Sequence, residues 1–200
     1  MSFEHEDPTP VDARPDPRTV ALDRADTLLL VVDLQERLAA AMDPAALALV
    51  ARNAEVLIRA AVRLGLPVVA SEQYPRGLGP TLPQLKALLP AAPLEKVEFS
   101  CGNNKALART VLQTGRRQVI VTGMETHVCV FQTVRDLVRG GFCAFVPQDA
   151  VLSRTEQNKS LGLKLIEKAG GTVSSTESLL FDLLGQAGTP EFKELSALIK

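Results

Sequence analysis

A cysteine, an aspartate and a lysine are the side chains of this sequence that are best suited to chemistry. Cys129 follows an apolar run at 117–123 and begins an amphipathic segment that continues to Arg139. A helix N-terminus stabilises a thiolate, and it can lower a thiol pKa from about 8.5 to between roughly 3.5 and 7.5. Cys129 is therefore a candidate nucleophile. The alternative is a small apolar core residue, since free cysteines are among the most buried residues.

Asp33 and Lys96 are the candidate partners of this thiol. Asp33 ends the apolar run 27–33, where a carboxylate could accept a thiol proton. An N-cap or a turn residue is the alternative for an aspartate after a strand. Lys96 precedes a short apolar piece, and a lysine beside a thiol favours the thiolate and can hold a carboxylate in place. A solvated surface lysine is the alternative for Lys96.

The elements around these residues predict how they meet. Apolar runs predict buried strands at 27–33, 67–71, 117–123, 142–147 and 172–174, and a short extended piece at 97–99. Helical patterns lie between them at 44–65, 81–89, 103–114, 129–139, 156–169, 176–185 and 190–199. This alternation predicts an α/β fold with three α/β/α layers: a Rossmann-like, mostly parallel, six-stranded sheet with helices on both faces. Because parallel strands end at one edge, Asp33 and Cys129 are expected to face one crevice.

Composition limits the other classes of function. The chain has 200 residues and a net charge of −1. We expect one domain at 21–200 after a proline-rich, acidic tail at 1–20. No basic run suggests nucleic acid, no apolar run approaches the roughly 18 residues of a membrane span, and no secretory signal begins the sequence. Three cysteines without a CxxC motif favour a reducing cytoplasm over a disulfide framework.

Three segments resemble the signature segments of the isochorismatase-like cysteine hydrolases, which include nicotinamidases, N-carbamoylsarcosine amidases and isochorismatases. These segments are Val31–Gln35, Glu95–Ser100 and Gly123–Cys129. The resemblance covers residues 25–185, and Ser71–Pro75 and Ser175–Ser178 place it nearest to the isochorismatase-domain-containing branch.

The resemblance implies a catalytic triad of Asp33, Lys96 and Cys129. Asp33 would take the thiol proton and later serve as the acid, Lys96 would stabilise the ion pair, and Cys129 would attack a carbonyl to give a thioester. It also implies a cis peptide bond between Met124 and Glu125. That bond would turn the Glu125 amide toward the site, where it would form an oxyanion hole with the Cys129 amide.

One departure from the family concerns metal. Nicotinamidases carry an aspartate and a histidine as metal ligands where this chain has Gln73 and Pro75. Proline cannot coordinate a metal, so we expect no metal and no cofactor, and nicotinamide becomes a doubtful substrate.

Several neighbours of the three segments receive secondary roles. His127 is two residues from Cys129, too close along a helix to face it, and a packing or hydrogen-bonding role is expected. Cys101 and Cys143 are expected to be buried spectators, and Asp149 is expected to be structural. Candidates to line a substrate pocket are Gln35, Gln73, Tyr74 and Phe99, with aromatic packing as the alternative for the last two.

Three hypotheses follow for the function. The first is a metal-independent cysteine hydrolase that acts on an amide or related carbonyl of a small molecule. The second is a binding or interaction protein that keeps the same fold without catalysis, and the third is a redox-sensing thiol. A homo-oligomer, either a dimer or a tetramer, is expected because members of the family commonly assemble.

Overall fold

The structure is a computed structural model that describes residues 20–200. All but the last residue of the predicted tail at 1–20 lies outside the described residues. The strands are β1 (Thr27–Val32), β2 (Val68–Gln73), β3 (Leu94–Lys96), β4 (Gln118–Met124), β5 (Cys143–Pro147), β6 (Val151–Leu152) and β7 (Thr172–Ser174). The α-helices are α1 (Glu36–Ala39), α2 (Pro44–Leu64), α3 (Pro75–Leu78), α4 (Pro83–Lys86), α5 (Lys105–Gln113), α6 (Phe131–Arg139), α7 (Glu156–Lys168), α8 (Thr176–Leu184) and α9 (Pro190–Ser196).

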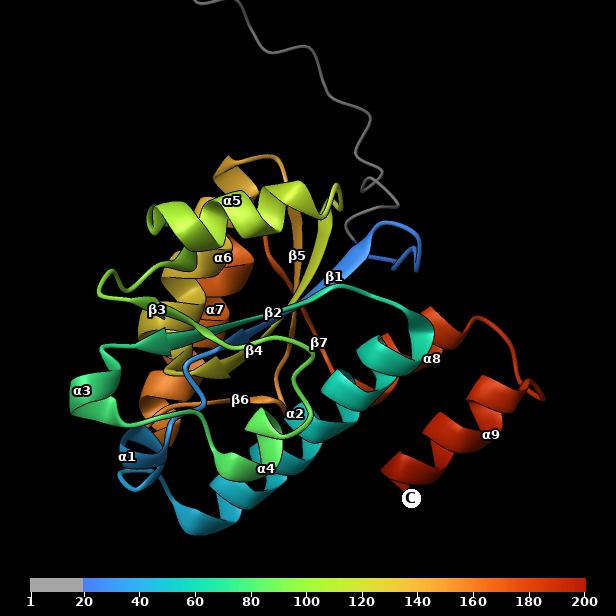
Figure 1. The fold of residues 1–200 in the computed structure, drawn as a ribbon, viewed down its shortest axis with the longest axis horizontal. Helices are drawn as coiled ribbons and strands as arrows, with labels where there is room; N and C mark the ends of the chain where they lie inside the picture. The colour runs from blue at the N-terminus through green and yellow to red at the C-terminus, as the bar shows by residue number, and fades with distance from the viewer. Residues whose placement is uncertain (1–19) are drawn as a thin grey trace, which may run out of the picture.

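Six strands form one parallel row in the order β3-β2-β1-β4-β5-β7, and β6 pairs with the end of β4. The chain builds outward from β1 to β3 and then returns to the other side of β1 with β4 (Figure 1). This change of direction between β1 and β4 is the topological switch point, where open α/β sheets bind their ligands.

Alternate side chains of β1 belong to two different cores. Leu29 and Val31 pack into the core beneath α2, α8 and α9, whereas Leu28 and Leu30 pack into the core beneath α5 and α6. Successive side chains of a strand point to opposite faces, so a strand that is apolar throughout must be covered on both. The predicted three-layer α/β/α fold with a parallel sheet is confirmed (Figure 1).

Four local features differ from the sequence-based expectation. The short strand expected at 97–99 lies at Leu94–Lys96, and β6 was not predicted. Two single-turn helices, α1 and α3, follow the ends of β1 and β2. The turn that holds Cys129 is a π-helix, Thr126–Val130, which leads into α6. Each was missed because it is short, so its hydrophobic pattern is too brief to show a period.

Within residues 20–200, no helix combines the length and apolar character needed to cross a membrane.

Candidate active site

Asp33 follows the last residue of β1 and is completely buried. Its backbone has a φ of 53°, a left-handed conformation that aspartate tolerates better than most residues. One carboxylate oxygen, Oδ1, accepts a hydrogen bond from Ser71 Oγ at 2.7 Å, and the other, Oδ2, accepts one from Lys96 Nζ at 2.6 Å. Asp33 is thus a buried carboxylate held by two donors.

Lys96 ends β3, two strands away from β1, and its side chain is also completely buried. Its ammonium group donates to Asp33 Oδ2 at 2.6 Å, to Gln73 Oε1 at 2.6 Å and to the Phe99 carbonyl at 3.2 Å. A lysine has three N–H donors, so these bonds use all of them. The solvated alternative for Lys96 is wrong, because the side chain spans the strand ends to reach Asp33.

Cys129 lies in the π-helical turn after β4 and is 7% exposed. Its thiol and the Asp33 carboxyl group lie close enough for each to shift the pKa of the other. Close approach of β4 to β1 depends on Gly123, where φ is 138° and an added Cβ would overlap the Val32 carbonyl. The Met124–Glu125 peptide bond is cis, as the resemblance implied. The structure therefore brings Asp33, Lys96 and Cys129 together.

The electrostatics of the thiol differ from the expectation. Burial, followed by the negative charge of Asp33, raises the pKa of Cys129 to about 12, and Lys96 opposes this only in part. A helix N-terminus was expected to lower this pKa, but loss of water around the sulfur outweighs it. Burial also raises the pKa of Asp33, although Lys96 lowers it. Cys129 therefore rests as a thiol next to a carboxyl group of increased proton affinity.

Residues after β6 hold the segment that precedes Cys129. The Glu125 carboxylate accepts hydrogen bonds from the Arg154 main-chain N–H at 3.0 Å and from Arg154 Nε at 3.1 Å. His127 Nδ1 lies 3.0 Å from Ser153 Oγ, which confirms its predicted hydrogen-bonding role. Helix α7 packs closely on this turn at Gly162, where an added Cβ would come within 2.7 Å of the main-chain nitrogen of His127.

The four predicted pocket residues fall into two pairs. Gln35 is fully buried, and its amide bonds the Gln73 main chain and, at 2.6 Å, the Gly79 carbonyl. The Gln73 side chain accepts from Lys96 and donates to the Val97 carbonyl at 2.9 Å. Gln73 therefore contacts the Lys96 ammonium group directly, and Gln35 holds the main chain of Gln73.

Tyr74 and Phe99 form the second pair and are each 55% exposed. A hollow of about 360 Å³ lies beside Tyr74, with further walls from Glu95, Lys96 and Glu98, whereas Phe99 does not line it. The Lys96 ammonium group points inward to Asp33, so only the remainder of the Lys96 residue lines this hollow. Exposed aromatic rings of this kind are suited to contact a bound molecule rather than the core.

Sequence reasoning missed three residues that shape the site: Ser71, Arg154 and Cys101. Ser71 was placed in a strand, but nothing in an apolar run marks the one hydroxyl that reaches Asp33. Arg154 follows β6, an element of two residues with no detectable period. Cys101 was expected to be a spectator, but its thiol donates to Ser71 Oγ at 3.6 Å, so it belongs to the same network.

The other secondary predictions have mixed outcomes. Asp149 is structural, since its Oδ1 accepts hydrogen bonds from the N–H and the hydroxyl of Thr176 at the start of α8. Cys143 is half-buried rather than buried. Across residues 20–200, no three histidine, cysteine or acidic side chains are grouped closely enough to hold a metal ion.

Comparison with known proteins gives a family match and curated relatives. Residues 27–178 match the isochorismatase domain family. The secreted isochorismatase effector Isc1 of Phytophthora sojae is 38% identical over 156 residues, which are 76% of this chain and 74% of that protein. Isochorismatase domain-containing protein 1 of Salmo salar is 36% identical over 72% of this chain, and the match spans about half (51%) of that relative's length.

Solved structures are similar over most of the chain. The MAR1 ribonuclease of Caenorhabditis elegans has a TM-score of 0.82 and 34% identity, covering 90% of this chain and 92% of that one. The YcaC gene product of Escherichia coli, described as an octameric hydrolase of unknown specificity, has a TM-score of 0.84 and 25% identity. That match covers 93% of this chain and 92% of the YcaC chain.

Proposed function

The chain belongs to the isochorismatase domain family, and we propose that it is a cysteine hydrolase that cleaves an amide or related carbonyl of a small molecule through a thioester on Cys129. The observation that carries the proposal is the buried ion pair between Lys96 Nζ and Asp33 Oδ2, at 2.6 Å. An ion pair in a dry interior is costly to build, and a protein that only needed a packed core would do as well with apolar side chains.

The first half of the reaction forms the thioester. Asp33 accepts the thiol proton as the Cys129 sulfur bonds to the substrate carbonyl carbon, and negative charge moves to the carbonyl oxygen. Main-chain N–H groups of Glu125 and Cys129 are the proposed donors to this oxyanion. The tetrahedral intermediate then collapses, the C–N bond breaks, and Asp33 returns its proton to the leaving amine.

The second half regenerates the enzyme. Asp33, again a carboxylate, takes a proton from water as the water oxygen attacks the thioester carbon. Collapse of this intermediate releases a carboxylic acid, and the proton on Asp33 returns to the sulfur. Lys96 stays charged throughout and offsets the negative charge that passes between Asp33 and the sulfur.

The resting pKa of about 12 for Cys129 supports this order of events. A thiol with so high a pKa needs a base in contact with it, and Asp33 is that base. Attack therefore depends on the simultaneous transfer of the proton rather than on a standing thiolate. This is the activation used by hydroxyl and thiol nucleophiles that have an adjacent general base.

A substrate panel tests the proposal. Small primary amides, carbamoyl compounds and ureides would be incubated with the protein, and released ammonia would be measured. We expect turnover of at least one class, a loss of at least 10³-fold in Cys129→Ala, and near-normal rates in the matched control Cys143→Ala. Equal turnover in wild type and Cys129→Ala would show that the nucleophile is wrong.

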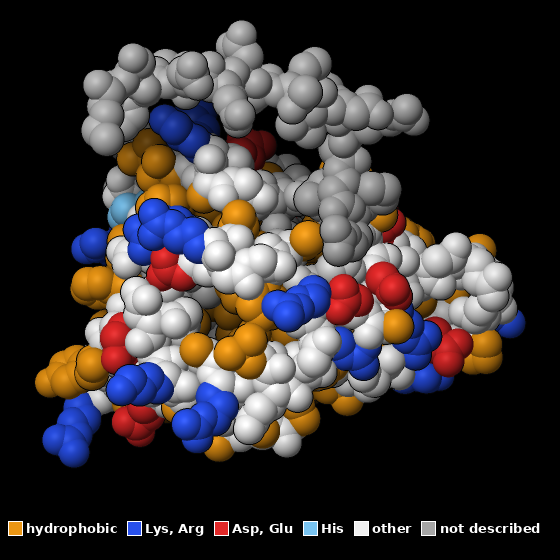
Figure 2. Space-filling model, turned by 90° about the horizontal axis from the view of Figure 1, so that it is seen from above, with side chains coloured by type: hydrophobic (Ala, Val, Ile, Leu, Met, Phe, Trp, Pro, Cys, Tyr) orange, Lys and Arg blue, Asp and Glu red, His pale blue; other side chains and the backbone are white. Residues whose placement is uncertain are grey.

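The expected absence of nucleic-acid binding stays a prediction, because several similar solved structures are named MAR1 ribonucleases or putative ones. In Figure 2 basic and acidic side chains alternate over the visible part of one face. Together with a net charge of −1, this pattern disfavours a phosphate-binding surface. A fluorescently labelled RNA that stays intact and unbound at low salt is the expected result.

We also propose a homo-oligomer in a reducing compartment. The Escherichia coli relative is described as octameric, so an assembly larger than the expected dimer or tetramer is among the outcomes of light scattering. The chain has three cysteines and no CxxC motif, a pattern that supports a reducing compartment. Secretion is the contrasting possibility, given the name of the Phytophthora sojae relative, and fractionation of the source cells distinguishes the two.

A further inference from the structure

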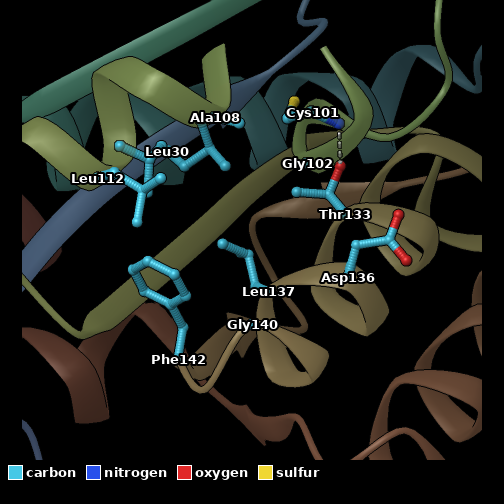
Figure 3. Close-up of a pocket in the computed structure, with 11 residues that line it drawn as sticks. Leu30, Cys101, Gly102, Ala108, Leu112, Thr133, Asp136, Leu137, Gly140 and Phe142 are labelled. Atoms are coloured by element: carbon cyan, nitrogen blue, oxygen red, sulfur yellow. Dashed lines mark hydrogen bonds between the residues drawn. The ribbon is translucent and has the colours of Figure 1, made fainter. Parts of the chain in front are cut away.

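A crevice of about 190 Å³ lies between α5 and α6, on the face of the sheet opposite to α2. Figure 3 shows Leu30, Leu112, Leu137 and Phe142 around one open space, with Cys101 at its far end. Leu30, Leu137 and Phe142 are buried, while Leu112 is 58% exposed at the entrance. Neither Asp33 nor Cys129 lines the crevice, so it is separate from the reaction site.

The polar groups in the crevice wall are already paired. Thr133 Oγ1 accepts a hydrogen bond from the Cys101 main-chain N–H at 3.0 Å, drawn as a dashed line in Figure 3. The Asp136 carboxylate pairs with Arg135 Nε, also at 3.0 Å. A polar or charged ligand would lose water without gaining partners here, whereas an apolar one gains by leaving water. A dry apolar cavity of about 150 Å³ is large enough for benzene.

A chain of three buried groups joins the floor of the crevice to the reaction site. The Cys101 thiol donates to Ser71 Oγ at 3.6 Å, and Ser71 Oγ donates to Asp33 Oδ1 at 2.7 Å. Burial raises the pKa of Cys101 to about 11, so its thiol keeps the proton that it donates. A molecule in the crevice would lie against Cys101, whose thiol is bonded to the hydroxyl that holds Asp33.

We propose that this crevice is a second ligand site for a small, uncharged, apolar molecule of about the size of benzene, and that its occupation is transmitted to Asp33 through Cys101 and Ser71. The site regulates the triad rather than holding substrate, since a molecule in it cannot reach the Cys129 sulfur. The binding part of the proposal does not depend on the reaction that the triad catalyses.

Benzene is the probe for binding. Titration of the full chain with benzene, followed by methyl NMR, should give saturable shifts and intermolecular NOEs to Leu137 and Val111, both of which line the crevice. Ala108→Leu places a larger side chain in the crevice and should weaken binding at least tenfold. Ala106→Leu, on the exposed side of the same helix, is the matched control and should stay within twofold of wild type.

Three results would overturn the binding proposal. One is the absence of saturable shifts in wild type, and another is equal binding by Ala108→Leu. The third is dissociation of an oligomer by Ala108→Leu without any benzene effect, which would make the crevice a contact between copies of the chain.

The transmission step has its own measurement, which needs no substrate. The rate at which iodoacetamide labels Cys129 would be followed by peptide mass spectrometry with and without saturating benzene. We expect at least a twofold change in wild type and none in Cys101→Ala, in which benzene binding is confirmed separately. An unchanged rate in wild type refutes transmission. Because neither experiment measures turnover, a failure here is distinguishable from a failure of the hydrolase proposal.

Discussion

Replacement of Lys96 by methionine tests the buried ion pair. Lys96→Met keeps the length of the side chain but removes the charge, so Asp33 Oδ2, Gln73 Oε1 and the Phe99 carbonyl each lose a donor. Breaking a buried pair by removing one partner costs about 3–5 kcal/mol. We expect a loss of this size in the free energy of unfolding at pH 7, measured by urea denaturation. The exposed pair Arg59–Glu55 is the control, and Arg59→Met should cost less than about 1 kcal/mol.

Two further measurements assign the loss to the uncompensated charge of Asp33. Burial already raises the pKa of Asp33, and removal of Lys96 raises it further. A carboxyl group whose pKa is higher in the folded than in the unfolded protein stabilises the fold at pH values below its unfolded pKa, which is near 4 for aspartate. This stabilisation is lost as pH rises through the pKa of the folded state. The deficit of Lys96→Met should therefore be smaller at pH 4 than at pH 7. For the same reason, Asp33→Asn/Lys96→Met should be more stable at pH 7 than Lys96→Met alone.

Either of two results would show that Lys96 does not compensate a buried charge on Asp33. A loss below about 1 kcal/mol at pH 7 would mean that the pair behaves like one on the surface. A deficit that does not change between pH 4 and pH 7, together with strict additivity in the double variant, would mean that Asp33 carries no uncompensated charge in the absence of Lys96.

Three further predictions concern single positions. Ser71→Ala should move the acid limb of the kcat/KM profile to higher pH, because the Ser71 hydrogen bond lowers the Asp33 pKa; an unmoved limb contradicts this. Labelling of Cys129 by iodoacetamide should rise about tenfold per pH unit from 7 to 10, as a pKa of about 12 requires, whereas a plateau contradicts it. Gly123→Ala should lower the urea midpoint far more than Gly115→Ala, which meets open space; similar losses contradict the overlap with Val32.

The fold was predictable because the hydrophobic patterns of its strands and helices extend over many residues. Residues 28–32 are all apolar, which predicts a strand covered on both faces, and α2 shows a full amphipathic period. The carboxyl ends of such parallel strands meet at one edge of the sheet, so the sequence alone predicts that Asp33 and Cys129 face one crevice. The structure adds the reason that they touch, which is the close passage of β4 past β1 at Gly123.

The features that the sequence left open or did not predict are short elements and properties that depend on burial. For Lys96 the polar neighbours alone left a solvated surface residue open, and only the family resemblance implied a place beside Asp33; the pairing of β3 with β2 is what brings its ammonium group inward. The pKa of Cys129 depends on how much water reaches the sulfur, a quantity that no motif encodes, and helix position alone predicted the wrong direction. Ser71 and Cys101 join the network through side-chain directions across strands, which linear spacing does not fix.

The most direct test of the central proposal is to trap the acyl group on Cys129. A substrate that is turned over in the panel would be mixed with the protein, quenched in acid within milliseconds and analysed by mass spectrometry. We expect a mass increase equal to the acyl group on the peptide that contains Cys129, present during turnover and absent from Cys129→Ala. Steady turnover without any adduct, undiminished in Cys129→Ala, would contradict it.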